Sequence, residues 1–141
     1  MEQIKTETYS RNKMQELAVQ IMYDFLIQQE LNSTIDVQKT ISEMQDKPYE
    51  ECDLFLKEVL IKSLKNEKDI IDNISKYLIN WKFDRLNKCI QAILIIAFSN
   101  YFYCGNKEKP IIINVAVQLA KKYGESNDYK FVNAILDKAL N

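Results

Sequence analysis

The scarcity of glycine and proline limits the folds open to this chain. Only two of each occur among its 141 residues, and the tight turns of a β-sandwich or β-barrel depend on such residues. Long segments run without interruption between these breaks, which favours helices. The length suits one core or two small lobes. We therefore expect an all-α fold, a helical bundle of six to seven helices.

Apolar residues recur at helical spacing in the first expected helix. It begins near Ser10, a good N-cap residue, and follows a loose arm over residues 1–8. Its apolar stripe comprises Met14, Leu17, Ala18, Ile21, Met22 and Phe25. Such a stripe packs against a core.

Capping and breaking residues divide the middle of the chain. Ser33 and Asp36 resemble a capping box that opens a shorter helix, and Pro48 ends it and begins the next. Asn66 either caps a following helix or kinks one long helix.

The last third of the chain predicts a central helix and a closing pair. Residues 84–103 form the most apolar helix, which we expect at the centre of the fold or under a partner. Gly124 is predicted as the C′ residue of the next helix, and Ser126 as the cap of the last one. We expect a single domain over residues 9–141, with sub-lobes of about 9–66 and 67–141.

Several classes of chemistry lack the residues they need. The chain has no histidine, and two glycines could not build a phosphate-binding loop. Paired carboxylates would still allow an enzyme, but the 20 acidic residues of a helical protein mostly form solvated faces. We therefore expect no catalytic residues, no metal and no cofactor. No apolar run approaches the length of a membrane span, and the first residues do not form a secretory signal. Cys52, Cys89 and Cys104 are predicted to be reduced, mostly buried thiols of a cytoplasmic protein.

The charge of the chain is divided unevenly between its two halves. Residues 1–72 carry 9 Lys or Arg and 15 Asp or Glu, a net charge of −6. Residues 73–141 carry 10 Lys or Arg and 5 Asp or Glu, a net charge of +5. This asymmetry indicates a basic side that faces a partner, although it would equally serve docking between lobes.

Five stretches follow one another in a distinctive order. They are Ala18-Val-Gln20-Ile-Met-Tyr23, Trp81-x-x-Asp84-Arg85-Leu86, Ala92-Ile-Leu-Ile-Ile-Ala97, Ile113-Asn114-x-Ala116-Val117-x-Leu119-Ala120-Lys121 and Lys130-Phe131-Val132-Asn133-x-x-Leu136-Asp137. Within roughly 130 of the 141 residues, the ordered set resembles the NusB family of transcription antitermination proteins.

The resemblance implies a fold of two helical bundles and a role that is not enzymatic. It implies binding of boxA-like single-stranded RNA in ribosomal RNA leader transcripts. The implied protein partner is the small-subunit ribosomal protein that doubles as Nus factor E. The pair then joins RNA polymerase and other Nus factors in a complex that reads through terminators.

The resemblance also implies two groups of RNA-binding residues. The family has an arginine-rich run at the start of its first helix, and here that run contains Arg11, Asn12, Lys13 and Gln15. Gln15 stands where an arginine is expected. Without the resemblance, Arg11 and Lys13 would be taken for an ordinary solvated helix start. At the start of this helix we expect the cationic side chains and the free N–H groups to bind RNA phosphates.

The second group lies near the end of the chain. It comprises Tyr123, Asn127, Lys130 and Phe131, and Tyr77 is a further candidate. Planar rings there would stack on unpaired bases. Phe131 has an equal alternative as a core residue, because it forms an apolar stripe with Ile135 and Leu136.

The sequence departs from the family pattern in the central helix. Ile95 stands where an arginine is usual and Asn100 where a glutamate is usual. Val115 replaces a further glutamate, and Gln118 replaces another acidic residue. The resemblance assigns the central-helix glutamate to the surface that meets the ribosomal protein, so Ile95 and Asn100 are the predicted partner-facing residues. Ile95 could equally be a core residue or lie in a self-association face.

Two alternatives remain at this point. The chain could be a NusB-like helical adaptor, a monomer or a homodimer, that has lost much of its RNA binding. The helical N-terminal domain of an RNA methyltransferase also resembles NusB. Such an enzyme needs a methyl-donor domain with a glycine-rich turn, which this sequence lacks.

Overall fold

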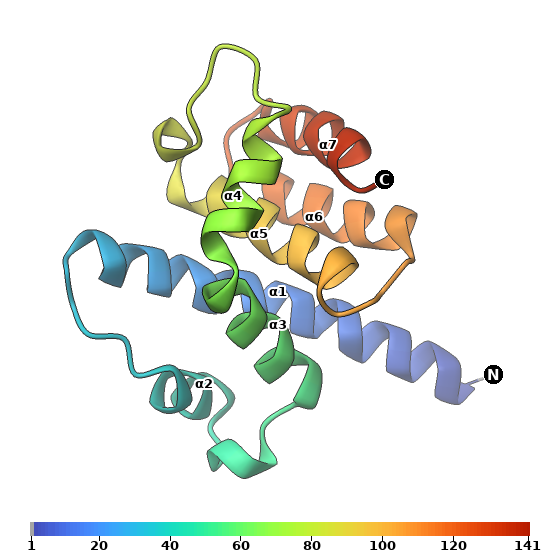
Figure 1. Ribbon diagram of the computed structural model, residues 1–141. Helices are drawn as coiled ribbons and strands as arrows, with labels where there is room; N and C mark the ends of the chain where they lie inside the picture. Colours follow the sequence, from blue (N-terminus) through green and yellow to red (C-terminus); the bar gives the residue numbers. More distant parts are fainter. Residues whose placement is uncertain (1) are drawn as a thin grey trace.

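The computed structural model describes the backbone of residues 2–141 and the side chains of residues 11–141. The described chain forms seven α-helices and two short 3-10 helices, without strands (Figure 1). These elements are α1 (Glu2–Glu30), α2 (Val37–Gln45), η1 (Tyr49–Glu51), α3 (Leu54–Lys65), α4 (Glu67–Ser75), η2 (Phe83–Arg85), α5 (Lys88–Phe102), α6 (Lys109–Tyr123) and α7 (Asp128–Ala139). The all-α prediction is confirmed.

The apolar helix α5 lies at the centre of the fold. It contacts α1, α3, α4, α6 and α7, and so it has no solvent-facing stripe. Ile93, Leu94, Ile95 and Ile96 are fully buried. Each such side chain stabilises the fold by about 1.5–3 kcal/mol. The expectation that this helix would be central is therefore confirmed.

Helix α1 connects most of the molecule. It contacts α2, α3, α5 and α6, which belong to both of the expected sub-lobes. One cluster of buried apolar side chains includes residues of all seven α-helices. The boundary between sub-lobes near residue 66 stays a prediction.

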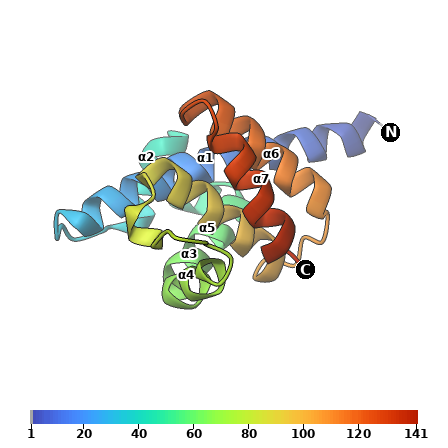
Figure 2. The ribbon, with the colours of Figure 1, turned by 90° about the horizontal axis from the view of Figure 1, so that it is seen from above.

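Helix α6 lies between α1 and α7. Contacts join α6 to α7, α5 and α1, and Figures 1 and 2 show α6 and α7 side by side. In Figure 1, α2 and η1 lie at the opposite end of the molecule from α7. Among the helices of residues 2–141, none combines the length and apolarity that a membrane span needs.

The helix starts differ from the predicted ones in several places. Residues 2–8 belong to α1 instead of forming a loose arm, and Ser10 lies inside that helix. The cap of α2 is Asp36, whose carboxylate accepts the amide N–H of Lys39, so the cap predicted at Ser33 is wrong. Asp36 is the last extended residue before the helix and a stronger acceptor than a hydroxyl.

Two further helices begin later than predicted, because another residue provides the N-cap. Pro48 precedes the single turn η1, and α3 begins only after Asp53, whose side chain accepts the N–H of Leu56. Helix α5 begins after Asn87 and not at Asp84, because the Asn87 side chain accepts the N–H of Ile90. The starts of α3 and α5 are therefore set by the capping residues that directly precede them.

Asn66 and Ser126 do not act as side-chain caps. The Asn66 side chain donates back to the carbonyl of Lys62, and it marks a break between α3 and α4. At the last helix, the N-cap position is held by Asn127 and not by Ser126.

Candidate nucleic-acid interface

The first expected RNA-binding group lies on the part of α1 that adjoins α3 and α6. Arg11 and Lys13 are exposed and Asn12 is half-buried. The Arg11 guanidinium carbon lies 4.6 Å from the centroid of the Phe55 ring in α3, a cation–π contact. Asn12 and Lys13 instead line a groove between α1 and α6, together with Asn114. The two cations thus remain available to solvent on neighbouring faces.

Gln15 does not belong to this surface. Only 2% of it is exposed, and its Nε2 donates to the carbonyl of Ile112 at 3.4 Å. Its Oε1 accepts from Asn100 Nδ2, also at 3.4 Å. Gln15 is therefore a polar core residue that joins α1 to α5 and α6, and an RNA contact from this position does not fit its burial.

The two residues predicted to face a protein partner are also buried. Ile95 is 0% exposed and Asn100 is 1% exposed. A partner-facing surface at these positions does not fit that burial. The Asn100 Oδ1 has no hydrogen-bond partner among the described residues.

Two departures from the family pattern meet in this buried site. The resemblance implies arginine at position 15 and glutamate at position 100, and here the amides of Gln15 and Asn100 are hydrogen-bonded. A buried guanidinium or carboxylate needs a charged partner, whereas a pair of amides does not. The two neutral residues are therefore compatible with each other inside the core.

Tyr123 lies at the end of α6 with part of its ring in solvent. It is 41% exposed, and its hydroxyl oxygen accepts a hydrogen bond of 2.9 Å from Gln20 Nε2 in α1. The ring lines a hollow of about 320 Å³ with Val19, Gln20, Tyr23 and Cys89. An orientation fixed by a hydrogen bond suits a ring for stacking.

Tyr23 is a surface residue that sequence reasoning did not place in the site. It is 44% exposed and shares the hollow with Tyr123. The signal was available, because Tyr23 lies outside the apolar stripe of α1 although it is aromatic. Tyr123, its neighbour across the hollow, is 100 positions away in the sequence, so the proximity of the two rings could not be predicted from the sequence.

Lys122 is less available than its exposure indicates. Its Nζ forms an ion pair of 3.2 Å with Glu16 in α1. The hydrogen bond to the Glu16 carboxylate raises the pKa of Lys122. This cation therefore links α6 to α1.

Gly124 forms the corner between α6 and α7. It is the C-cap residue of α6 and not the predicted C′ residue, and its φ of −98° and ψ of −172° are extended. Glycine is required there by space. A Cβ would lie 2.7 Å from the carbonyl oxygen of Ala120 and 2.8 Å from Asp128 Oδ2. That carboxylate accepts the N–H of Glu125 at 2.7 Å and closes the corner.

Replacing Gly124 by alanine should lower the free energy of unfolding by about 1–2 kcal/mol, because the added methyl group would clash with the Ala120 carbonyl oxygen and displace Asp128. Urea denaturation measures the change. Ser126→Ala is the matched control, since Ser126 is exposed on the same corner, and it should stay close to wild type. A Gly124→Ala protein as stable as wild type would show that the corner is not tightly packed.

The remaining residues of the second group differ in their surroundings. Asn127 and Lys130 are exposed, whereas Tyr77 and Phe131 are half-buried against the core. Phe131 therefore packs partly against the core and is partly exposed, so its surroundings are intermediate between the two predicted ones. Lys130 lines a groove between α6 and α7, apart from the hollow of Tyr123. Among the described residues, no hydrogen bond, ion pair or shared hollow joins Tyr77 to the rest of the group.

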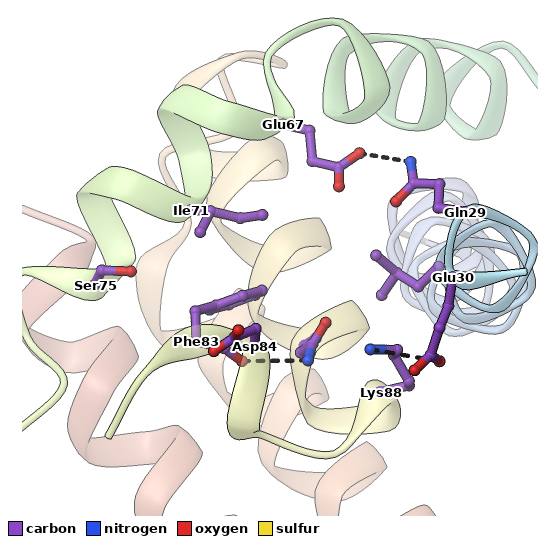
Figure 3. Close-up of a pocket in the computed structure, with 10 residues that line it drawn as sticks. Gln29, Glu30, Glu67, Ile71, Ser75, Phe83, Asp84 and Lys88 are labelled. Carbon is purple, nitrogen blue, oxygen red and sulfur yellow. Dashed lines mark hydrogen bonds and ion pairs between the residues drawn. The ribbon is translucent and has the colours of Figure 1, made fainter. Parts of the chain in front are cut away.

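An acidic cleft lies between the end of α1, α4, η2 and the start of α5 (Figure 3). Glu67 accepts a hydrogen bond from Gln29 at 2.8 Å, and Lys88 lies 3.8 Å from a carboxylate oxygen of Glu30. Asp84 adds a third carboxylate to this single lysine. The excess negative charge repels phosphate and favours a basic ligand.

The cysteines and acidic side chains are the possible metal ligands of this chain, which has no histidine. All three cysteines are free. Burial, together with the nearby Glu58 carboxylate, raises the pKa of Cys104 to about 12, which leaves it an unreactive thiol at neutral pH. Within residues that the structure describes, no three His, Cys, Asp or Glu side chains gather as metal ligands would.

The fold defines this protein as an all-helical bundle with a central apolar helix. A solved structure of NusB from T. maritima is similar, with a TM-score of 0.77 and 26% identity, and the match covers 92% of this chain and 89% of that one. The family model of NusB matches residues 12–141.

Curated relatives agree with this match. The transcription antitermination protein NusB of Methylacidiphilum infernorum is 33% identical over 133 residues, which cover 93% of this chain and 90% of the relative. The transcription antitermination protein NusB of Clostridium tetani is 32% identical over 146 residues, which cover 91% of this chain and 95% of the relative. This chain belongs to the NusB family of transcription antitermination proteins.

Proposed function

We propose that this protein binds boxA-like single-stranded RNA of ribosomal RNA leader transcripts in the cytoplasm. It acts with the small-subunit ribosomal protein that doubles as Nus factor E, and the pair joins RNA polymerase and other Nus factors. Membership in a family of transcription antitermination proteins supports this role.

The exposed cations on both sides of α6 are the observation that carries the RNA-binding proposal. Arg11 and Lys13 lie on α1, and Lys130 lies on α7. Tyr123 and Tyr23 add two partly exposed rings at the end of α6 and on α1. Cations that hold phosphates and rings that stack on bases are what single-stranded RNA requires.

The acidic cleft is the proposed docking site for the protein partner, in place of Ile95 and Asn100. Glu30, Glu67 and Asp84 surround one lysine there. Proteins that bind ribosomal RNA carry basic surfaces, and such a surface is complementary to this cleft.

A titration of labelled boxA-like RNA tests the function. Binding should be tighter than to a scrambled RNA of the same length, and the ribosomal protein should strengthen it further. Repeating the titration at two salt concentrations counts the phosphate contacts, because each one contributes about −0.7 to the logarithmic salt slope. Equal binding of both RNAs, with no effect of the ribosomal protein, would refute this function.

The second candidate function is a NusB-like adaptor or dimer with little RNA binding. It is favoured by exposed apolar side chains in the α4–η2 connection, where Ile79 is 72% and Trp81 58% exposed. Such residues are typical of protein contacts. Light scattering measures whether the chain is a dimer. A dimer that binds boxA-like RNA no more tightly than scrambled RNA would favour this function.

A further inference from the structure

Two grooves flank α6 and meet at one residue. The groove on the α1 side contains Asn12 and Lys13, and the groove on the α7 side contains Lys130. Asn114 lines both of them. The two groups of expected RNA-binding cations are therefore connected by a surface that crosses α6 at Asn114.

The α6–α7 groove is rich in lysine. Lys109, Lys121 and Lys130 line it, and its volume is about 590 Å³. The positive charge of Lys109 is compensated by an ion pair, because its Nζ lies 3.5 Å from a carboxylate oxygen of Asp137. Lys121 and Lys130 have no ion-pair partner among the described residues, so two uncompensated positive charges remain on its walls.

Tyr129 orders these two lysines. Its ring centroid lies 4.8 Å from the Nζ of Lys121 and 5.9 Å from that of Lys130. Cation–π contacts reduce the freedom that the lysine side chains would lose on binding a ligand. The groove thus presents two pre-positioned cations, one from α6 and one from α7.

Other lining residues fit a polynucleotide. Ile113 and Val117 supply apolar contact area, and the amides of Asn114 and Asn133 supply donors and acceptors. An acidic peptide would satisfy the lysines as well. The shared Asn114 favours RNA, because the same polyanion could then continue from the cations of α1.

We propose that RNA adjoining the boxA-like segment crosses α6 at Asn114 and occupies the α6–α7 groove. Lys121 holds phosphates of this flank, Lys130 is shared between the flank and the boxA-like segment, and Asn114 and Asn133 contact the bases or riboses of the flank. This inference rests on the proposed function and extends it from the boxA-like segment to its single-stranded flank.

The test compares two RNAs, the boxA-like segment alone and the same segment lengthened at its 5′ or 3′ end. One lengthened RNA should bind the wild-type protein more tightly and with a steeper salt dependence. Lys121→Gln should reduce this gain about fivefold at moderate salt and lower the slope by about 0.7, while it leaves the short RNA unaffected. Lys138→Gln, an exposed lysine of α7 outside the groove, is the matched control.

The outcomes separate this inference from the function on which it rests. Tight binding of the short RNA with no gain from either extension would overturn the flank site and leave the function intact. Equal weakening of both RNAs by Lys121→Gln would also overturn it, because the groove would then hold the boxA-like segment itself. Competition by polyglutamate that depends on Lys121, without any gain from the extensions, would assign the groove to an acidic peptide. Failure of both RNAs to bind would refute the function and the flank site together.

Discussion

Replacing Gln15 by arginine should lower the free energy of unfolding by about 3–5 kcal/mol, the range for an unpaired buried charge. Gln15 is 2% exposed, and its neighbour Asn100 offers an amide and no carboxylate. The guanidinium would lose its water without gaining a charged partner. Urea denaturation of the single variant measures the loss.

The matched control combines Gln15→Arg with Asn100→Glu. The two side chains are hydrogen-bonded at 3.4 Å, so their charged replacements could form an ion pair in the same place. The double variant should recover most of the stability that either single variant loses. Simple addition of the two losses would show that these side chains do not interact, and a neutral Gln15→Arg would contradict the burial of Gln15.

Tyr123→Ala should weaken boxA-like RNA binding by about 1–3 kcal/mol, the usual contribution of one base stacked on an aromatic ring. This is about a 5- to 150-fold loss of affinity. The ring is 41% exposed and already oriented by Gln20. Fluorescence anisotropy with labelled RNA measures the change, and circular dichroism checks the helices.

Tyr123→Phe serves as its control, because it keeps the ring and removes the hydroxyl that contacts Gln20 and Lys122. Its affinity should remain near that of wild type. If phenylalanine and alanine weaken binding equally, the hydroxyl is the important group and base stacking is not. Unchanged binding by Tyr123→Ala would remove this residue from the interface.

The fold could be predicted largely because helical periodicity is a local property. The apolar stripe of the first helix places Ala18, Ile21, Met22 and Phe25 in the core, and all four are fully buried. The centrality of α5 followed from its lack of a polar face. Neither prediction needed knowledge of which helices meet.

Helix starts were less predictable because several residues compete for each cap. Ser33 and Asp36 both have suitable side chains, and only the backbone at Asp36 leads directly into α2. The same competition moved the start of α5 from Asp84 to Asn87. A small difference in local geometry decides such cases.

The candidate site was predicted incompletely because its long-range contacts have no local signal. Gln15 was assigned to a surface, yet it meets Asn100, which lies 85 positions away in the sequence. Because α5 has no continuous polar face, its sequence does not indicate which side a partner would cover. Ile95 and Asn100 were therefore assigned to a partner surface by resemblance alone. The core alternative for Ile95 fits its burial, whereas the burial of Asn100 was missed.

The contacts of α1 with α2, α3, α5 and α6 link ligand binding to global stability. A ligand held by the outer face of α1 binds a helix whose inner face belongs to the common core. Its binding free energy therefore adds to the unfolding free energy of the whole chain, by an amount that grows with the logarithm of free ligand concentration. The melting temperature of this protein thus becomes a readout of binding for any ligand of α1, and it continues to rise with ligand concentration after the site is full.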